Sequence, residues 1–365
     1  MNEYCCPLCS GINNIEFYQL QFRKKDFLPD KISFMYCDSC NFVFTVPRDE
    51  KLYMQYYANC KNDQLSKELN AEHYRIQKKI IASHTDLTRG ISILDFGCGC
   101  GGLLSSLRTD YTANTYIGFD PNPEQLPGIT CYQDMAQITG KKFDLIICSH
   151  ILEHAVNPYF LDFSLLLNEN GSVYVEVPDP FLYQHRQRRE YLYYLDRVHI
   201  NHFSKKSLCK LFSRYGLSCL HHGDASFPYK DGKPYPATYM IFTKNSAENP
   251  TSLHENHLYK SINTYIDNDK KRKKFVSDIL VYGFGDNFFR SRQPGGPLEK
   301  ANILAIIDKN AASLIKKYGE KFVFTDIASA ARDYKNIPVV VCVSFESEKI
   351  VETLHNAGFT TVDSI

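Results

Sequence analysis

Four cysteines near the start of the chain have the spacing of metal ligands. They form two C-x2-C pairs, Cys6 with Cys9 and Cys37 with Cys40. A two-residue gap folds each pair into a tight turn, and two such turns can supply the four thiolates of a closed tetrahedral zinc site. Because a closed site leaves no position for water, we expect a structural Zn²⁺ that stabilises a module with little core of its own. Two alternatives stay open: a Cys5/Cys9 pairing, whose spacing is less favourable, and four unrelated buried thiols.

A second candidate site is the glycine-rich segment DFGCGCGG at residues 95–102. Glycines let the backbone turn sharply and let a ligand approach the main chain closely. The segment fits G-x-G-x-x-G through Gly97, Gly99 and Gly102, so a dinucleotide site is a competing interpretation. Asp95 argues against it, because a carboxylate there repels a pyrophosphate but attracts the sulfonium and ammonium groups of S-adenosylmethionine. We therefore expect S-adenosylmethionine as the cofactor.

A second acid, Asp120, follows the next apolar run at 116–119. A carboxylate at this place can accept hydrogen bonds from both hydroxyls of a ribose, which suits either cofactor. The simpler interpretation is a turn residue before Pro121.

The segment HILEH at 150–154 spells H-x-x-E-H, the pattern of inverted zincin metalloproteases. That chemistry needs both histidines on one face of a helix. Here the segment directly follows an expected strand, so we disfavour a protease. The alternative is that Glu153 and His154 cap and support a turn.

Alternating apolar runs and amphipathic segments must position these residues. We expect strands at 91–96, 116–119, 143–148, 173–177 and 238–243, and a second series at 279–282, 303–307 and 339–343. Helices are expected at 51–57, 65–84, 204–215 and 347–357, and another that contains the basic run 270–274. Strands that alternate with helices predict an α/β fold with a largely parallel sheet. The polar segment NSAENPTS at 245–252 is the expected linker.

Length and charge set the wider expectations. A chain of 365 residues suggests two or three domains. The net charge of +1 gives no general attraction to nucleic acid or to a membrane surface. The chain has no apolar run of about 18 residues and no signal-peptide pattern at its start. We therefore expect a cytoplasmic protein whose thirteen cysteines are mostly reduced thiols.

Four segments resemble, in order, the motifs of class I S-adenosylmethionine-dependent methyltransferases. They are ILDFGCGCGG, YIGFDPNP, FDLIICSHILEH and NENGSVYVEVPDP, which cover about residues 90–180. The resemblance implies a Rossmann-like core whose glycine loop wraps the methionine part of the cofactor. It also implies that Asp120 holds the ribose, that Asp134 lies near the adenine, and that Ser149 and His150 line the pocket. The full set of expected cofactor-binding residues is Asp95, Phe96, Gly97, Gly99, Gly101, Asp120, Asp134, Ser149 and His150.

Methyl transfer is an in-line displacement in which the protein orients the acceptor and can deprotonate it. A base that works near neutral pH is most often a histidine. His199 and His202 follow the fifth-strand region, where the acceptor pocket is expected. We expect one of them to be the general base. The alternative is that both satisfy a loop or the start of the helix at 204.

The whole arrangement resembles bacterial sugar C-methyltransferases, which act on nucleotide-linked deoxysugars. It implies a zinc-binding module (1–50), a methyltransferase core (51–248) and a C-terminal Rossmann-like α/β domain (249–365). In the last domain Gly283, Gly285 and Asp308 form a partial nucleotide fingerprint and are the expected substrate-binding residues. We expect C- or O-methylation of a nucleotide-linked sugar or polysaccharide precursor. The alternatives are an RNA or protein methyltransferase that uses the zinc module for recognition, and a non-catalytic cofactor-binding protein.

Overall fold

The computed structural model describes residues 4–24, 27–59, 70–124, 126–186, 188, 190–229, 232–244, 255–343 and 346–365. The chain forms two compact units built from separated segments. The first comprises Met1–Phe17, Phe34–Arg186 and Val198–Ile262, and the second Tyr18–Ser33, Gln187–Arg197 and Asn263–Ile365. The division into three continuous domains at 1–50, 51–248 and 249–365 stays a prediction. The expected linker at 245–252 lies outside the described residues.

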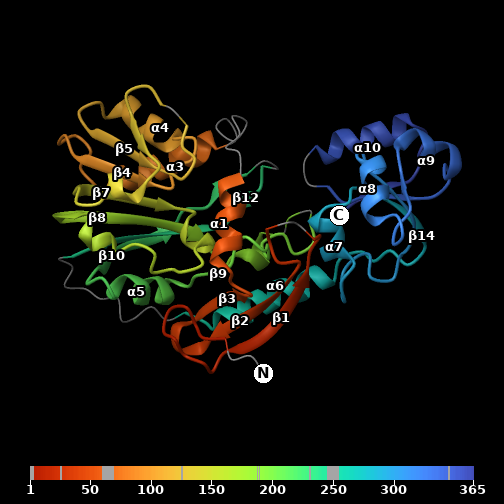
Figure 1. The fold of residues 1–365 in the computed structure, drawn as a ribbon, viewed down its shortest axis with the longest axis horizontal. Helices are drawn as coiled ribbons and strands as arrows, with labels where there is room; N and C mark the ends of the chain where they lie inside the picture. Colours follow the sequence, from red (N-terminus) through yellow and green to blue (C-terminus); the bar gives the residue numbers. More distant parts are fainter. Residues whose placement is uncertain are drawn as a thin grey trace. The chain divides into compact units, whose positions relative to one another are not determined.

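A seven-stranded sheet forms the centre of the first unit (Figure 1). Its order is β10-β13-β8-β7-β4-β5-β6. The strands are β4 Ser92–Phe96, β5 Thr115–Phe119, β6 Thr130–Tyr132, β7 Phe143–Ser149, β8 Leu167–Pro178, β10 Ser218–Asp224 and β13 Ala237–Thr243. All neighbours are parallel except β13, which runs antiparallel to both β8 and β10. The strand order reverses between β4 and β7, and ligands of such sheets bind at the carboxyl ends beside this point.

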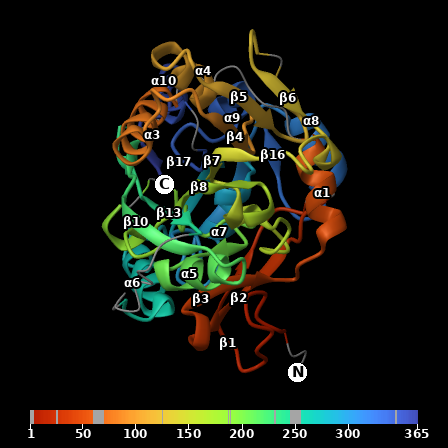
Figure 2. The ribbon, with the colours of Figure 1, turned by 90° about the vertical axis from the view of Figure 1, so that its left-hand side faces the viewer.

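Both faces of this sheet are covered by helices. Alternating residues of one strand point to opposite faces. Ile93 therefore packs with residues of α3 (Ala71–His84) and α4 (Gly102–Asp110), and Leu94 packs in the cluster that contains residues of α5 (Lys205–Ser213). Both views show α5 on the opposite side of the sheet from α3 and α4 (Figures 1 and 2). Ser204 caps α5 by accepting a hydrogen bond from the backbone N–H of Ser207.

The first unit also contains another helix, a short strand pair and strands of a second, four-stranded sheet. A four-stranded sheet has the order β1-β2-β3-β9, with β1 Ile15–Gln21, β2 Lys31–Cys37, β3 Phe42–Val46 and β9 Asn201–His202. Helix α1 spans Glu50–Asn59, and the short strands β11 Phe227–Pro228 and β12 Pro234–Tyr235 form a hairpin. Cys37, Phe42 and Phe44 share one buried cluster with Leu94 and Val175 of the central sheet.

The second unit contains a parallel five-stranded sheet of order β16-β15-β14-β17-β18. Its strands are β14 Asp278–Tyr282, β15 Asn302–Ile307, β16 Phe324–Thr325, β17 Val339–Val341 and β18 Val362–Ser364. The remaining helices are α6 Leu258–Lys270, α7 Asp286–Ser291, α8 Ala311–Tyr318, α9 Ile327–Asp333 and α10 Ser347–Asn356. The predicted α/β fold with a Rossmann-like core is confirmed.

One expected helix differs from the structure, and another is described only in part. The prediction of a helix that contains residues 270–274 is wrong, because α6 ends at Lys270. The backbone N–H groups of Lys271 and Arg272 donate to the carbonyls of Asn268 and Asp269, three residues back, at 3.2 and 3.1 Å, so the last turn tightens and the α-helix stops. Of the helix expected at 65–84, the structure describes α3, and residues 65–69 lie outside the described part.

No helix within the described residues is long and apolar enough to cross a membrane.

Candidate active site

The glycine loop leaves β4 at the carboxyl end of the sheet. Gly97 and Gly99 have φ values of +85° and +51°, a region that favours glycine. The backbone N–H of Gly97 donates to the carbonyl of Phe119 at 2.7 Å, which ties the loop to β5. A Cβ built on Gly99 would meet no atom within 4 Å. The main chain at Gly99 is therefore open to a ligand, as a cofactor-binding loop requires.

Asp120 joins this loop to the end of β5. One carboxylate oxygen accepts a hydrogen bond from the backbone N–H of Gly99 at 3.0 Å, and the other accepts one from Asn122 at 2.8 Å. Each carboxylate oxygen has a second lone pair. Asp120 can therefore hold the loop and still accept hydrogen bonds from a ribose.

Asp95 lies at the base of the loop and is 5% exposed. Burial, with the negative charge of Asp120, raises its pKa from 3.8 to about 7. A cationic ligand would favour the ionised form of this carboxyl group. The electrostatics of the site therefore suit S-adenosylmethionine, as its sulfonium and ammonium groups carry positive charge.

The other expected cofactor residues lie along the same strand ends. Phe96 stacks on Phe119, with ring centroids 4.7 Å apart. Ser149 ends β7, and its hydroxyl accepts a hydrogen bond from Gln77 of α3 at 2.7 Å. Asp134 is exposed and accepts a hydrogen bond from the backbone N–H of Ala136, which caps a short 3-10 helix. The loop glycine Gly101 has a φ of +67° and precedes α4.

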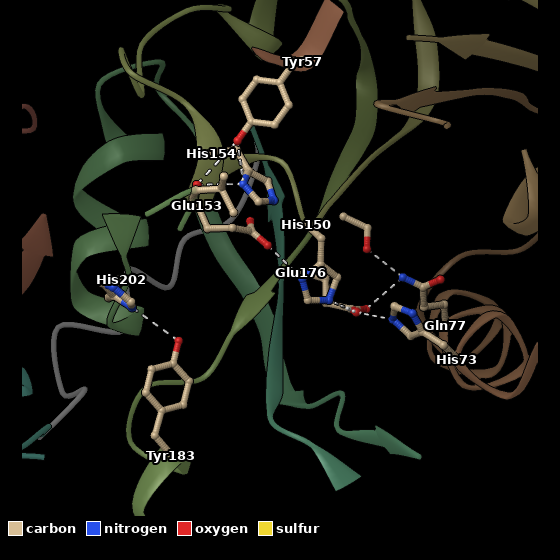
Figure 3. Close-up of polar contacts among 11 residues, drawn as sticks. Tyr57, His73, Gln77, His150, Glu153, His154, Glu176, Tyr183 and His202 are labelled. Carbon is tan, nitrogen blue, oxygen red and sulfur yellow. Dashed lines mark hydrogen bonds and ion pairs between the residues drawn. The ribbon is translucent and has the colours of Figure 1, made fainter. Parts of the chain in front are cut away.

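A buried cluster of histidines and glutamates lies beside Ser149. Glu176 of β8 is the register partner of Ser149 and is fully buried. Its carboxylate accepts hydrogen bonds from His73 at 2.5 Å, His150 at 3.2 Å and Gln77 at 3.2 Å, and another from Tyr174. Figure 3 shows Glu176 between the rings of His150 and His73.

His150 bridges two carboxylates. Its Nδ1 lies 2.8 Å from Glu153 and its Nε2 lies 3.2 Å from Glu176. Burial disfavours the charged ring, but the two carboxylates outweigh it and raise the pKa of His150 to about 10. Burial likewise opposes ionisation of Glu176, yet its contacts with His73 and His150 hold its pKa well below its usual range. His150 is thus a positioned imidazolium with both N–H groups engaged.

Helix α3 connects this cluster to the glycine loop. His73 is 7% exposed and stacks on Phe227 of the β11–β12 hairpin, with ring centroids 3.6 Å apart. The next residue, Tyr74, places its hydroxyl 3.5 Å from the sulfur of Cys100. A Cβ on Gly102 would lie 2.2 Å from the Tyr74 ring, so a larger residue there would displace that ring. One turn of helix therefore contacts both the expected cofactor loop and Glu176.

The two expected base residues, His199 and His202, lie in different surroundings. His199 is half-buried and its ring lies 4.9 Å from that of His154. His202 lies on β9, is 2% exposed, and contacts Phe34 and Tyr183. Burial, with His199 nearby, lowers the pKa of His202 to about 3. These contacts favour a packing role for His202.

The H-x-x-E-H pattern does not form an α-helix. His150 has a φ of +53°, and Leu152–His154 form a single 3-10 turn. His150 and His154 consequently make separate contacts, with Glu176 and with the carbonyl of Val198. The geometry agrees with the rejection of a zincin site.

The four cysteines of the two C-x2-C pairs converge. The Cys6 and Cys40 sulfurs are 3.9 Å apart and the Cys9 and Cys37 sulfurs are 3.7 Å apart. All four sulfurs lie within 4.8 Å of one another. A zinc–sulfur bond of about 2.3 Å in tetrahedral geometry puts sulfurs about 3.8 Å apart. The tetrad therefore fits Zn²⁺, while Cys5 is exposed.

The second unit has a smaller version of the same strand-end arrangement. The N–H of Gly283, at the end of β14, donates to Ile307 at 2.9 Å. The carboxylate of Asp308 accepts from the backbone N–H of Phe284 at 3.2 Å. Gly285 precedes α7, and a Cβ there would meet no atom within 4 Å. The three expected substrate-binding residues Gly283, Gly285 and Asp308 therefore lie together at the carboxyl ends of β14 and β15.

Sequence reasoning missed His73, Gln77 and Glu176. Glu176 is a single acid in the strand VYVEVP, and a charged residue inside an apolar strand is the signal that could have identified it. His73 and Gln77 sit at helix positions i and i+4 and so share one face.

Residues 69–222 match a protein-family model that is described as a methyltransferase domain. The match spans the glycine loop, Asp120, His150 and Glu176, and it confirms the predicted methyltransferase. No curated protein matches the chain.

Solved structures of similar fold include three methyltransferase chains. One is from the complex between the Haloferax volcanii Trm112 methyltransferase activator and the putative methyltransferase (15% identity, 55% of this chain and 100% of that chain, TM-score 0.41). Another is Burkholderia thailandensis 1,6-didemethyltoxoflavin-N1-methyltransferase (13% identity, 62% of this chain and 100% of that chain, TM-score 0.40). The third is magnesium protoporphyrin IX methyltransferase from Synechocystis (16% identity, 53% of this chain and 93% of that chain, TM-score 0.37).

Proposed function

We propose that this methyltransferase transfers the methyl group of S-adenosylmethionine to a carbon or oxygen atom of a nucleotide-linked sugar or polysaccharide precursor. One observation carries the proposal for the reaction. The open glycine loop, with Asp95 and Asp120, shares a sheet edge with the buried pair of His73 and Glu176. A cationic cofactor and a proton acceptor can therefore meet at one place.

The cofactor supplies an activated methyl group on a sulfonium, and the chain supplies its binding groups. The exposed main chain at Gly99 accommodates the methionine part, and Asp95 offsets its positive charge. Asp120 holds the ribose with its remaining lone pairs. Phe96, Ser149 and His150 line the pocket, and Asp134 lies on the adenine side.

His73 is the general base that the geometry supports best. A carboxylate that accepts a hydrogen bond from one imidazole nitrogen fixes the tautomer and leaves the other nitrogen basic. The contact between His73 Nε2 and Glu176 Oε1, at 2.5 Å, has this form. His150 is already held between two carboxylates, so it orients Glu176 rather than taking a proton. The sequence-based candidates, His199 and His202, stand as the alternative.

The acceptor class rests on the second unit. Gly283, Gly285 and Asp308 form a loop and acid at the ends of parallel strands, which suits a nucleotide group. Together with the resemblance of the whole arrangement to sugar methyltransferases, this supports a nucleotide-linked sugar. The cysteine tetrad would hold a structural Zn²⁺, and reduced thiols of this kind fit a cytoplasmic location.

An RNA or protein acceptor, recognised by the zinc module, is the competing proposal. The net charge of +1 offers no basic surface on the scale that RNA binding requires. A non-catalytic cofactor-binding protein is the other alternative, and the buried polar cluster at His73 and Glu176 disfavours it.

The test is calorimetric titration with S-adenosylhomocysteine, NAD and a panel of nucleotide sugars, followed by transfer of a labelled methyl group to any sugar that binds. We expect S-adenosylhomocysteine and one nucleotide sugar to bind. Asp308→Asn should weaken the nucleotide sugar and leave S-adenosylhomocysteine unaffected. Binding of NAD in place of S-adenosylhomocysteine would refute the proposed cofactor assignment. Methylation of RNA or protein but of no sugar would refute the proposed acceptor class.

A further inference from the structure

A third group of metal-ligating side chains lies near the proposed active site, and the function proposed above assigns no metal ion to it. It consists of Glu153, His154 and His199, each of which offers one ligand atom. These atoms all lie within 4.8 Å of one another. The group is separate from the cysteine tetrad, and it brings together residues 45 positions apart in the chain.

The hydrogen bonds of His154 prepare one of its nitrogens to bind a cation. Its Nδ1 lies 2.9 Å from the carbonyl oxygen of Val198, which can only accept. Nδ1 must therefore carry the proton, and Nε2 has a free lone pair. Tyr57 also contacts Nδ1 at 3.0 Å (Figure 3). Metal-binding histidines commonly donate their second N–H to a backbone carbonyl in this way.

Glu153 offers a carboxylate oxygen to the same point. The side chain is 1% exposed, and its Oε1 accepts a hydrogen bond from His150 Nδ1 at 2.8 Å. Its Oε2 is buried and has no hydrogen-bond partner among the residues that the structure describes. A buried carboxylate oxygen without a partner is costly, and a bound cation would remove that cost.

We propose that Glu153, His154 and His199 bind a divalent transition-metal ion of the class that prefers two imidazole nitrogens and one carboxylate oxygen. Mn²⁺, Fe²⁺ and Zn²⁺ belong to this class, and three protein ligands leave positions open for water or an acceptor oxygen. The ligand set differs from that of an inverted zincin, since His150 faces two carboxylates instead of the cation. His199 then holds a metal ion rather than a substrate proton.

The test counts metal ions in the intact protein. Wild-type protein and variants are equilibrated with MnCl₂, desalted, and analysed for all first-row transition metals by mass spectrometry. Glu153→Gln and His199→Asn each remove one ligand and should each lower the total by one ion per chain. His221→Ala, which alters an exposed histidine elsewhere in the first unit, should leave the total unchanged.

Each variant is also checked for S-adenosylhomocysteine binding and for its melting temperature, so that a folding defect is recognised. Two ligand variants on different segments keep the test decisive when one of them fails to fold. Wild-type and folded variants with equal metal content would overturn the proposal. The count is a difference between wild type and variant, so it depends neither on the cysteine tetrad nor on the identity of the acceptor.

Discussion

The Asp120 carboxylate accepts a hydrogen bond from the backbone N–H of Gly99 at 3.0 Å. This contact joins the end of β5 to the loop that follows β4, two strands that lie side by side in the sheet. The acid that we propose as the ribose ligand therefore also fixes the shape of the glycine loop. Under this proposal, cofactor recognition and loop shape are coupled through one side chain.

Asp120→Asn should weaken S-adenosylhomocysteine binding. The change removes a charged acceptor that serves both the loop and the ribose hydroxyls. Hydrogen bonds to charged groups contribute about 1.5–3 kcal/mol, so we expect a loss of about 10- to 100-fold in affinity. Calorimetry measures the loss, and Asp86→Asn, an exposed acid of the same unit, serves as the control. Equal affinity in both variants would show that Asp120 does not contact the cofactor.

Binding of S-adenosylmethionine should strengthen as pH rises through 7. The pKa of Asp95 is raised to about 7 by burial and by Asp120, so the group is mostly neutral at pH 6. If the cation binds only to the ionised form, affinity at pH 6 is about five-fold weaker than at pH 7. The stability of the free protein should change in the opposite direction. Because the pKa of Asp95 is raised on folding, its contribution to the free energy of unfolding falls as pH rises from 3.8 towards 7.

Titrations at several pH values, in buffers of different ionisation enthalpy, would report the proton released on binding. Asp95→Asn should bind more weakly and lose the pH dependence. A wild-type affinity that stays flat between pH 6 and 8 would mean that another group sets the charge of the pocket.

Five strands of the seven-stranded central sheet could be predicted from sequence because they are largely buried on both faces, whereas the edge strands β6 and β10 were not predicted. Such strands are mostly apolar, as at 143–148 and 173–177, where a single acid interrupts each run, and they can be found without tertiary information. The glycine loop could also be predicted. Gly97 and Gly99 adopt positive φ values that few other residues tolerate, so the loop needs glycines at these positions and the sequence shows them.

The buried cluster could not be predicted in the same way. His73 and Glu176 are 103 positions apart, and they meet only because α3 packs over the sheet. A helix pattern shows which face is apolar but not which strand it will cover. The end of α6 at Lys270 was missed because the backbone hydrogen bonds that close its last turn, from Lys271 and Arg272 to carbonyls three residues back, leave no mark in the residue pattern.

Loss of one cysteine of the tetrad should destabilise the first unit. Cys37 and Cys40 belong to the same buried cluster as Phe42 and Leu94, so an unpaired ligand disturbs the core of the central sheet. Cys37→Ser should lose the zinc ion and lower the melting temperature, as structural zinc contributes directly to folding. Cys5→Ser, at an exposed thiol, should change neither property. A Cys37→Ser protein that melts normally without zinc would refute a structural metal.

His73→Asn should lower turnover and leave cofactor affinity largely intact. Asparagine keeps polar contact with Glu176 but cannot accept the proton of an acceptor, and removal of a general base typically costs about 10²–10⁴-fold in rate. The matched control is His84→Asn, at the other end of the same helix, where the ring contacts Tyr239 and His221 instead of the cluster. Single-turnover rates of methyl transfer separate chemistry from binding. If His73→Asn keeps full turnover, His73 is not the general base, and its contact with Glu176 has only a structural role.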